Sequence, residues 1–413
     1  MNLKQLVTLL VLVVVLGAAG LLIKQRGHSE FKGAGRDTVQ KLLGEFPYND
    51  VAHIAIKEGS NEVNLVKKDG VWRVRERYDY PASFPEIRDF LLKADDLKSL
   101  QSEKAGSPQL LRLELLPGQA SNPPVIVEFE DQGDKPVRTL LLGKKHMKKS
   151  NSPSPMGEMG DEGYPDGRWV RAGTNSDTAV LISDVLENIA PKPEQWLSKD
   201  FFKVEKIKSI AVTYPIETNS FKVSRDSESS TDWKLADART NELLALAKTS
   251  ELAFALNSPS FTDVLPADTK PEHTDLDKPT IVNLETFDNF SYTLKVGAKT
   301  NNNYAMTLTV AASIPKERPP IKDEKTEDKA QLEKEFAESQ KRLQDKLTQE
   351  KSCEKWIYIV SSYTLESVLK ERAQLLAEKK EEPKAGSSTN AVDTLTLPPP
   401  EPAANAGTNG AAN

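Results

Sequence analysis

Short segments in which hydrophobic and polar residues alternate recur along the chain. This period-two pattern is typical of a strand with one buried face. The segments form two triplets of similar order, and the last segment of each triplet carries a tryptophan. They are residues 53–56, 61–67 and 71–74 in the first half, and 209–212, 221–223 and 232–235 in the second. We therefore predict that the two halves of the chain share one arrangement of strands.

A helical pattern follows each triplet. Over residues 84–97 the apolar residues recur at helical spacing, and Ser83 is a candidate N-cap. Over residues 240–256 the apolar stripe is interrupted by Ser250. Both segments are predicted to be helices.

Each half continues with a strand hairpin that ends in a glycine. The hairpins cover residues 125–143 and 281–297. Their final glycines, Gly143 and Gly297, are 154 positions apart, and the first strands of the two triplets end 156 positions apart. An offset this constant over separate elements indicates duplication of one domain.

A strand pair and a short helix complete each half. We expect strands at 168–171 and 179–182 with a helix at 184–189, and strands at 304–310 and 356–360 with a helix at 365–376. The fold class is therefore α+β: two repeated domains of mainly antiparallel sheet with flanking helices, after an N-terminal transmembrane helix. The domains are assigned to residues 46–200 and 201–375. Five tryptophans are expected in their cores: Trp72, Trp169, Trp196, Trp233 and Trp356.

The second half contains an insert, residues 316–355, that the first half lacks. It begins Pro-rich and becomes strongly charged, and four of its apolar residues are spaced by four, seven and four. They are Leu332, Phe336, Leu343 and Leu347. The spacing predicts a helix with one apolar seam, similar to a short coiled coil. Two interpretations stay open: the seam rests on its own domain, or it docks a partner.

The strongest hydrophobic run follows a short tail, residues 1–5. Residues 6–23 form an apolar run without a charged residue. This run is long enough for a helix to cross a hydrocarbon core of about 30 Å. The alternative is a cleaved signal peptide, with Gly17 and Ala19 as the small residues of a cleavage site. Because apolar residues resume at 21–23, we expect an uncleaved anchor.

The segments outside the two domains are polar. Residues 24–45 are expected to form a stalk, and residues 376–413, rich in Ala, Pro, Gly, Asn and Ser, a disordered tail. More basic residues follow the apolar run than precede it, so a simple count would leave the large domain on the cytoplasmic side. Against this count, long domains translocate largely regardless of charge. A very short N-terminal tail is typical of a signal-anchor, so we expect a single-pass protein of the inner (cytoplasmic) membrane with its bulk extracytoplasmic.

Composition narrows the chemistry. The 413 residues carry a net charge of −6, which gives no basic footprint for nucleic acid, and a single cysteine, Cys353, which excludes an intrachain disulfide. No P-loop and no Gly-x-Ser-x-Gly elbow is present in the sequence. The acidic segment 150–167 does not match the EF-hand spacing, and the basic run 144–149 is expected to be solvated or to touch an anionic surface. We expect no catalytic residue, no metal site and no cofactor.

The order of these features resembles a known family. The shared pattern comprises a Trp-containing hairpin, a helix after Pro-Ala, strands that end in Gly-Lys, the Arg-Trp-Val-Arg strand at 168–171, and Trp196. It is similar to the bacterial membrane-anchored family called domain of unknown function 4340, over about residues 5–375. Members of that family commonly accompany the permease and GldG-like subunits of ABC-2-type transporters linked with gliding motility.

The resemblance implies a non-enzymatic, membrane-anchored accessory or scaffold subunit of an ABC-type transporter or envelope complex. Its partner would be the permease or a GldG-like subunit. Two alternatives remain. One is an independent extracytoplasmic binding module for polysaccharide or peptide, which a cleft between the two repeats lined with exposed aromatic residues would favour. The other is a hydrolase with an unrecognised site, which a pocket with two carboxylates or a Ser–His contact would favour.

Overall fold

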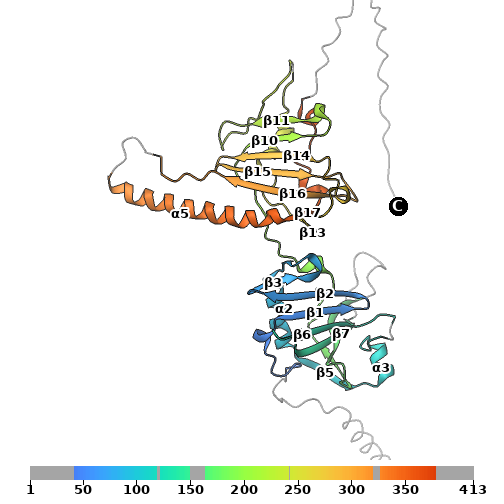
Figure 1. Ribbon diagram of the computed structural model, residues 1–413. Coiled ribbons are helices and arrows are strands. Elements are labelled where there is room, and N and C mark those ends of the chain that lie inside the picture. Colours follow the sequence, from blue (N-terminus) through green and yellow to red (C-terminus); the bar gives the residue numbers. More distant parts are fainter. Residues whose placement is uncertain (1–40, 119–120, 149–162, 241, 320–325, 378–413) are drawn as a thin grey trace, which may run out of the picture.

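The structure is a computed structural model that describes residues 41–118, 121–148, 163–240, 242–319 and 326–377. Within these residues the strands gather into two sheets, and every strand pair in them is antiparallel. Figure 1 shows one sheet above the other, with helices beside them. The predicted α+β class is therefore confirmed.

The first sheet has nine strands in the order β4-β3-β2-β1-β6-β7-β8-β9-β5. They are β1 (His53–Glu58), β2 (Asn61–Lys68), β3 (Val71–Val74), β4 (Tyr80–Pro81), β5 (Ser99–Lys104), β6 (Val125–Glu130), β7 (Pro136–Lys148), β8 (Tyr164–Ala172) and β9 (Thr178–Ile182). Two helices, α2 (Phe84–Asp96) and α3 (Ser107–Arg112), accompany this sheet.

The second sheet has eight strands in the order β12-β11-β10-β14-β15-β16-β17-β13. They are β10 (Ile207–Thr213), β11 (Phe221–Ser224), β12 (Lys234–Leu235), β13 (Asp263–Pro266), β14 (Thr280–Thr286), β15 (Phe290–Val296), β16 (Asn303–Ala312) and β17 (Trp356–Ser361). Apart from β4, the two orders correspond strand for strand. The repeat read from the sequence is thus also a repeat of topology.

The predicted helix at 84–97 is confirmed as α2. Its apolar residues Ile87, Phe90, Leu91 and Ala94 are buried against the first sheet, as their spacing requires. Ser83 stands at the N-cap position, but its side chain makes no capping hydrogen bond.

The predicted helix at 240–256 is wrong. Among its described residues, 240 and 242–256, the helical structure is limited to one α-helical turn, α4 (Leu246–Thr249), and a 3-10 turn at Ser250–Phe254. Its backbone instead pairs with the last described residues, because the Ala245 amide donates to the Leu375 carbonyl oxygen. Polar residues interrupt the stripe, and this competing backbone pairing replaces the first turns of the predicted helix.

The two short helices predicted after the last strand of each half are also corrected. Residues 184–189 form turns, because Leu186 is left-handed (φ 48°) and its amide donates to Asp184 Oδ1 at 2.8 Å. In place of one helix over residues 365–376, the second half has two four-residue helices, α6 (Ser362–Leu365) and α7 (Arg372–Leu375). At residues 184–189 a local side-chain hydrogen bond thus competes successfully with helix formation.

Gly143 and Gly297 have the same structural role in the two halves. A Cβ added to Gly143 would lie 2.3 Å from the Leu113 carbonyl oxygen, and one added to Gly297 would lie 2.1 Å from the Thr274 carbonyl oxygen. In each half, a connecting segment crosses the sheet at this point so closely that only glycine fits. The constant spacing of the two glycines thus reflects a shared packing requirement.

Aromatic side chains join the two halves. The Tyr80 ring, on β4, lies 5.0 Å from the Trp356 ring and 5.9 Å from the Phe261 ring, centroid to centroid. Phe201, in the connection between the halves, lies 4.5 Å from the Tyr358 ring. The main hydrophobic cluster contains buried residues of both halves, so the β4 edge of the first sheet is packed against the second half.

The chain enters the described part at the opposite edge of the first sheet. Lys41 forms a bridge with Lys98, directly before β5. Among the described helices, none combines the length and the hydropathy that a bilayer crossing requires. The expected tail (1–5), transmembrane helix (6–23), most of the stalk (24–45) and nearly all of the tail 376–413 lie outside the described residues.

Candidate functional site

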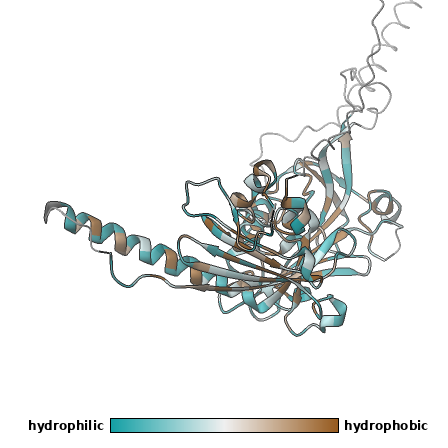
Figure 2. Cartoon of the chain, turned by 90° about the horizontal axis from the view of Figure 1, so that it is seen from above, coloured by the Kyte–Doolittle hydropathy of each residue, from teal (hydrophilic) through white to brown (hydrophobic). Residues whose placement is uncertain are grey.

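A long helix, α5 (Thr326–Lys351), occupies most of the insert in the second half. It contains no Gly or Pro, is rich in Glu, Lys, Gln and Leu, and so has high helix propensity throughout. Its 26 residues correspond to a length of about 39 Å. Figures 1 and 2 show that its N-terminal part runs out well beyond the sheet.

The C-terminal end of α5 is anchored by a buried carboxylate. Glu350 is 3% exposed, and it accepts hydrogen bonds from the Lys203 amide and from the Tyr292 hydroxyl, both at 2.9 Å. Burial raises the pKa of the Glu350 carboxyl. One turn earlier, Lys346 Nζ donates to the Lys203 carbonyl oxygen and, at 2.7 Å, to Glu205. These contacts fix the direction in which the helix leaves the domain.

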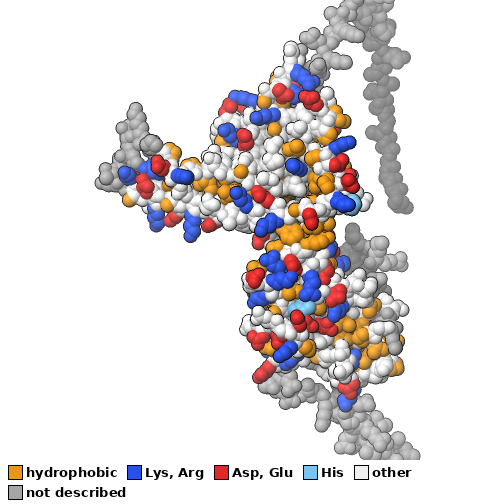
Figure 3. Space-filling view, in the orientation of Figure 1, with side chains coloured by type: hydrophobic (Ala, Val, Ile, Leu, Met, Phe, Trp, Pro, Cys, Tyr) orange, Lys and Arg blue, Asp and Glu red, His pale blue; other side chains and the backbone are white. Residues whose placement is uncertain are grey.

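The structure divides the predicted seam into two parts. Leu343 and Leu347 pack against the main hydrophobic cluster of the protein. Leu332 and Phe336 are partly buried but do not belong to the residues packed against that cluster. Figure 3 shows acidic and basic side chains around this projecting part. One half of the seam therefore rests on its own domain, and the other half carries its apolar side chains away from it.

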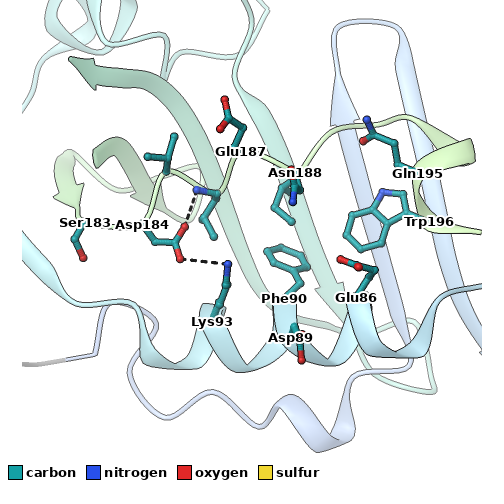
Figure 4. Close-up of a pocket in the computed structure, with 13 residues that line it drawn as sticks. Glu86, Asp89, Phe90, Lys93, Ser183, Asp184, Glu187, Asn188, Gln195 and Trp196 are labelled. Carbon is teal, nitrogen blue, oxygen red and sulfur yellow. Dashed lines mark hydrogen bonds and ion pairs between the residues drawn. The ribbon is translucent and has the colours of Figure 1, made fainter. Parts of the chain in front are cut away.

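A groove of about 680 Å³ lies in the first half between α2 and the turns that follow β9 (Figure 4). Phe90 and Trp196 lie in its floor with ring centroids 6.2 Å apart, and each is 3% exposed. Polar residues of both walls surround them: Glu86, Asp89, Lys93, Ser183, Asp184, Glu187, Asn188 and Gln195. The groove therefore joins a buried aromatic floor to a mainly acidic rim.

The Arg-Trp-Val-Arg strand supports this groove from below. Arg168, 9% exposed, donates to the carbonyl oxygens of Gly143 (2.9 Å), Val185 (3.3 Å) and Leu186 (3.2 Å). Burial lowers the pKa of the Arg168 guanidinium. On the other side, Trp196 Nε1 donates to the Ala190 carbonyl oxygen at 3.2 Å. These bonds to backbone carbonyls hold in place a wall that has no regular secondary structure.

Ion pairs neutralise part of the acidic rim. Lys93 Nζ lies 3.6 Å from Asp184 Oδ2, and Lys145 Nζ lies 2.6 Å from Glu187 Oε1. The hydrogen bond from Lys145 lowers the pKa of the Glu187 carboxyl. Figure 4 shows Glu86 beside the Trp196 ring, whereas Asp89 lies on the far side of α2. No histidine lines this groove, and its chemistry suits the binding of a cationic or amphipathic segment.

The five tryptophans occupy three kinds of position. Trp72, Trp196 and Trp233 are buried in the main cluster, at 5%, 3% and 7% exposure. Trp356 is partly buried at the junction of the halves, against Tyr80. Trp169 is partly buried on the other face of the first sheet, where it packs against a smaller cluster beneath α3. None of the five forms an exposed aromatic surface.

One cluster of side chains has the composition of a metal site. One ligand atom from each of His53, Glu130 and Asp134 can be chosen so that all three lie within 4.8 Å of one another. Both ring nitrogens of His53 already have partners, since Nδ1 lies 2.6 Å from Glu130 and Nε2 lies 2.8 Å from Asn64 Oδ1. These residues could hold an ion, but the two contacts also explain His53 and Glu130 as side chains that hydrogen-bond across β2, β1 and β6.

Sequence reasoning did not find the groove. Its aromatic floor comes from α2 and from a turn more than one hundred residues later, and no local motif links Phe90 to Trp196. The sequence singled out the parts of this region separately: the helix that carries Phe90, the Arg-Trp-Val-Arg strand and Trp196. Arginines in an otherwise apolar strand require polar partners when they are buried, so this strand was a signal that a buried polar contact lies nearby. In comparison with known proteins, no family model, curated protein or solved structure matches the chain.

Proposed function

We propose that this protein is a non-enzymatic, single-pass membrane protein that serves as an accessory scaffold of an ABC-type transporter or envelope complex. In this proposal residues 6–23 are the anchor, the two sheets form an extracytoplasmic body, and α5 is the arm that docks a partner. The partner is the permease or a GldG-like subunit, in keeping with the family that the sequence resembles.

The observation that carries the proposal is the projection of α5. A helix with no interaction outside its own domain would gain nothing from apolar residues in the part that leaves the domain. Leu332 and Phe336 are four residues apart and so lie on one face of the helix. Presenting apolar residues at this spacing is a common way for a helix to enter a groove of another protein.

The place where the chain enters the body agrees with the proposed anchor. Lys41 is at the β5 edge of the first sheet, and the second half packs at the opposite, β4 edge. An anchor before Lys41 would therefore hold the first half near the bilayer and α5 away from it. Tethering raises the effective concentration of the arm for neighbouring subunits of the same membrane.

Affinity purification in mild detergent tests the proposal. Tagged wild-type protein should recover a transporter permease or a GldG-like subunit from its native membrane. The double variant Leu332→Ala/Phe336→Ala should lose that partner, whereas the matched variant Glu333→Ala/Glu338→Ala, on other faces of the same helix, should retain it. Recovery of the wild-type protein without any transporter subunit would contradict the proposal.

The groove on α2 supports a second candidate, a peptide-binding module. Its floor is aromatic and its rim acidic, which matches a cationic or amphipathic peptide better than a neutral polysaccharide, because the ring faces of Phe90 and Trp196 are buried. Glu86→Lys reverses the charge beside the Trp196 ring, and so would weaken the binding of such a peptide without changing α5. Unchanged partner recovery by this variant would favour the arm over the groove.

A further inference from the structure

A second groove lies in the second half at the place that corresponds to the first. The groove on α2 is bounded by the helix that precedes strand β5 and by the segment that follows strand β9. The second groove, of about 610 Å³, is bounded by α4, which precedes β13, and by the segment that follows β17. Since β5 and β13 correspond in the two sheets, as do β9 and β17, both grooves belong to the repeated fold.

The charge of the two grooves is opposite. Four carboxylates, of Glu86, Asp89, Asp184 and Glu187, line the first groove with one lysine. Three lysines, Lys248, Lys299 and Lys370, line the second with one carboxylate, that of Glu366. The two grooves therefore share their bounding segments and differ in charge, and the second is also lined by Lys299 and Tyr304, which have no counterpart in the lining of the first.

The lysines of the second groove keep hydrogen-bond donors available. Lys248 Nζ donates to the Leu376 carbonyl oxygen at 3.0 Å, and Lys370 Nζ lies 2.9 Å from Glu251, whose side chain is 64% exposed. Lys299 is exposed, and within the described ranges it forms no ion pair. Because an ammonium has three N–H donors, each lysine can still donate to a ligand.

The neutral groups of this groove are also able to donate. Ser362 and Tyr304 contribute hydroxyls. Gln374 accepts the Glu371 amide through its Oε1, which leaves its side-chain N–H groups for another acceptor. Apart from the exposed Glu366 carboxylate, the lining therefore lacks a charged group that would repel an anion.

The geometry points to a binding site for an oxyanion, a phosphate group above all, in the second groove. The volume is sufficient for a phosphorylated or sulfated small molecule, or for an anionic group carried on a larger one. The ion pair with Glu251 accounts for the position of Lys370 in this groove. Lys299 has no such ion pair among the described residues, so the same explanation does not apply to it. This inference does not depend on the role of α5.

Calorimetric titration of the full-length protein, in mild detergent at low salt, with inorganic pyrophosphate tests the inference. Wild type should bind pyrophosphate, and the affinity should fall with added salt. Lys299→Gln should weaken binding about fivefold and Lys299→Glu about tenfold or more. Lys93→Gln, which removes the single lysine of the first groove, is the matched control and should leave the affinity unchanged.

A second arm separates the sources of the phosphate. Vesicles that contain anionic phospholipid replace pyrophosphate, and neutral vesicles serve as their control. Binding of pyrophosphate alone identifies a soluble ligand, and Lys299-dependent binding of anionic vesicles identifies a lipid headgroup. Absence of binding in both arms, or binding that Lys299→Glu leaves intact while the thermal unfolding midpoint is unchanged, would overturn the inference.

Discussion

Arg77 of the first half holds Asp263 of the second half through two hydrogen bonds, from Nε to Oδ1 at 2.5 Å and from Nη2 to Oδ2 at 2.9 Å. The pair joins residues 186 positions apart and lies beside the aromatic contacts of Tyr80. The hydrogen bond to Asp263 raises the pKa of the Arg77 guanidinium. A planar, bidentate pair of this kind fixes orientation as well as distance.

Removal of this pair should loosen the junction. Arg77→Ala should lower the free energy of unfolding by about 1 kcal/mol, since the pair is partly exposed to solvent. Arg77→Lys should not restore the loss, because an ammonium cannot reproduce the two parallel bonds. Urea denaturation of Arg77→Ala, Asp263→Ala and the double variant measures the coupling. Strictly additive effects of the two substitutions would show that the pair has no energetic role.

Alanine at the two repeated glycines should destabilise both halves. Gly143→Ala and Gly297→Ala would each place a Cβ against a backbone carbonyl oxygen, which cannot move without displacing its segment. We expect losses of about 2–3 kcal/mol each in chemical denaturation. Gly133→Ala is the control, because its nearest neighbour is a side-chain atom at 3.4 Å, and it should change stability by less than about 0.5 kcal/mol. Equal stability of all three variants would contradict the close approach.

The C-terminal segment should be released by acid. Glu242 accepts from Arg372 Nη2 at 2.6 Å, and this hydrogen bond lowers the pKa of the Glu242 carboxyl from 4.5 to about 2. A carboxyl whose pKa is lower in the folded state contributes stability above its unfolded pKa and loses it as the pH falls. Glu242→Gln should therefore be less stable than wild type at pH above 4.5, and the difference should vanish as the pH falls toward about 2.

The comparison of Glu242→Gln with wild type is needed because other groups titrate in the opposite sense. Burial raises the pKa of Glu350, so its contribution to stability falls as the pH rises above 4.5. The free energy of unfolding of both proteins is measured by denaturation at several pH values. The difference between the two proteins at each pH gives the contribution of Glu242. A difference that stays constant across this range would refute the assigned role of the Arg372 bond.

The two parts of the α5 seam should respond differently to truncation. Leu343→Ala and Leu347→Ala should each cost about 1–2 kcal/mol, because these side chains pack against the core. Leu332→Ala and Phe336→Ala should each cost less than about 1 kcal/mol in the purified protein. Thermal and chemical denaturation of the four variants checks this division. A large loss at position 336 would place its ring in the protein's own core.

The strands of the repeat were largely readable from the sequence. The alternation in residues 53–56, 61–67 and 71–74 identified β1, β2 and β3 because their alternate apolar residues are buried, although β1 and β2 also bury the residue between them, Ala55 and Asn64. The edge strands β5 and β13 were missed, since β5 is almost wholly exposed and thus has no alternation. The matching glycines, Gly143 and Gly297, indicated the repeat more reliably than the predicted helices did. A close contact with a backbone carbonyl oxygen requires glycine at both positions.

The candidate sites could be read only in part. The apolar spacing in the insert predicted a helix with a seam. The point where this helix leaves the domain depends on Glu350, which in the sequence cannot be told from the other acidic residues of a charged run. The grooves depend on turns held by Arg168 and by backbone pairing between residues far apart in the chain. No local pattern encodes such contacts.

Site-specific photo-crosslinking in the native membrane tests the central claim most directly. A photoreactive amino acid at position 336 should form an adduct with a transporter permease or a GldG-like subunit. The same group at position 338, whose native glutamate is largely exposed and lies on the opposite face of α5, should not. Adducts at neither 332 nor 336, in a protein that is folded and membrane-bound, would contradict the account of α5 as a docking arm.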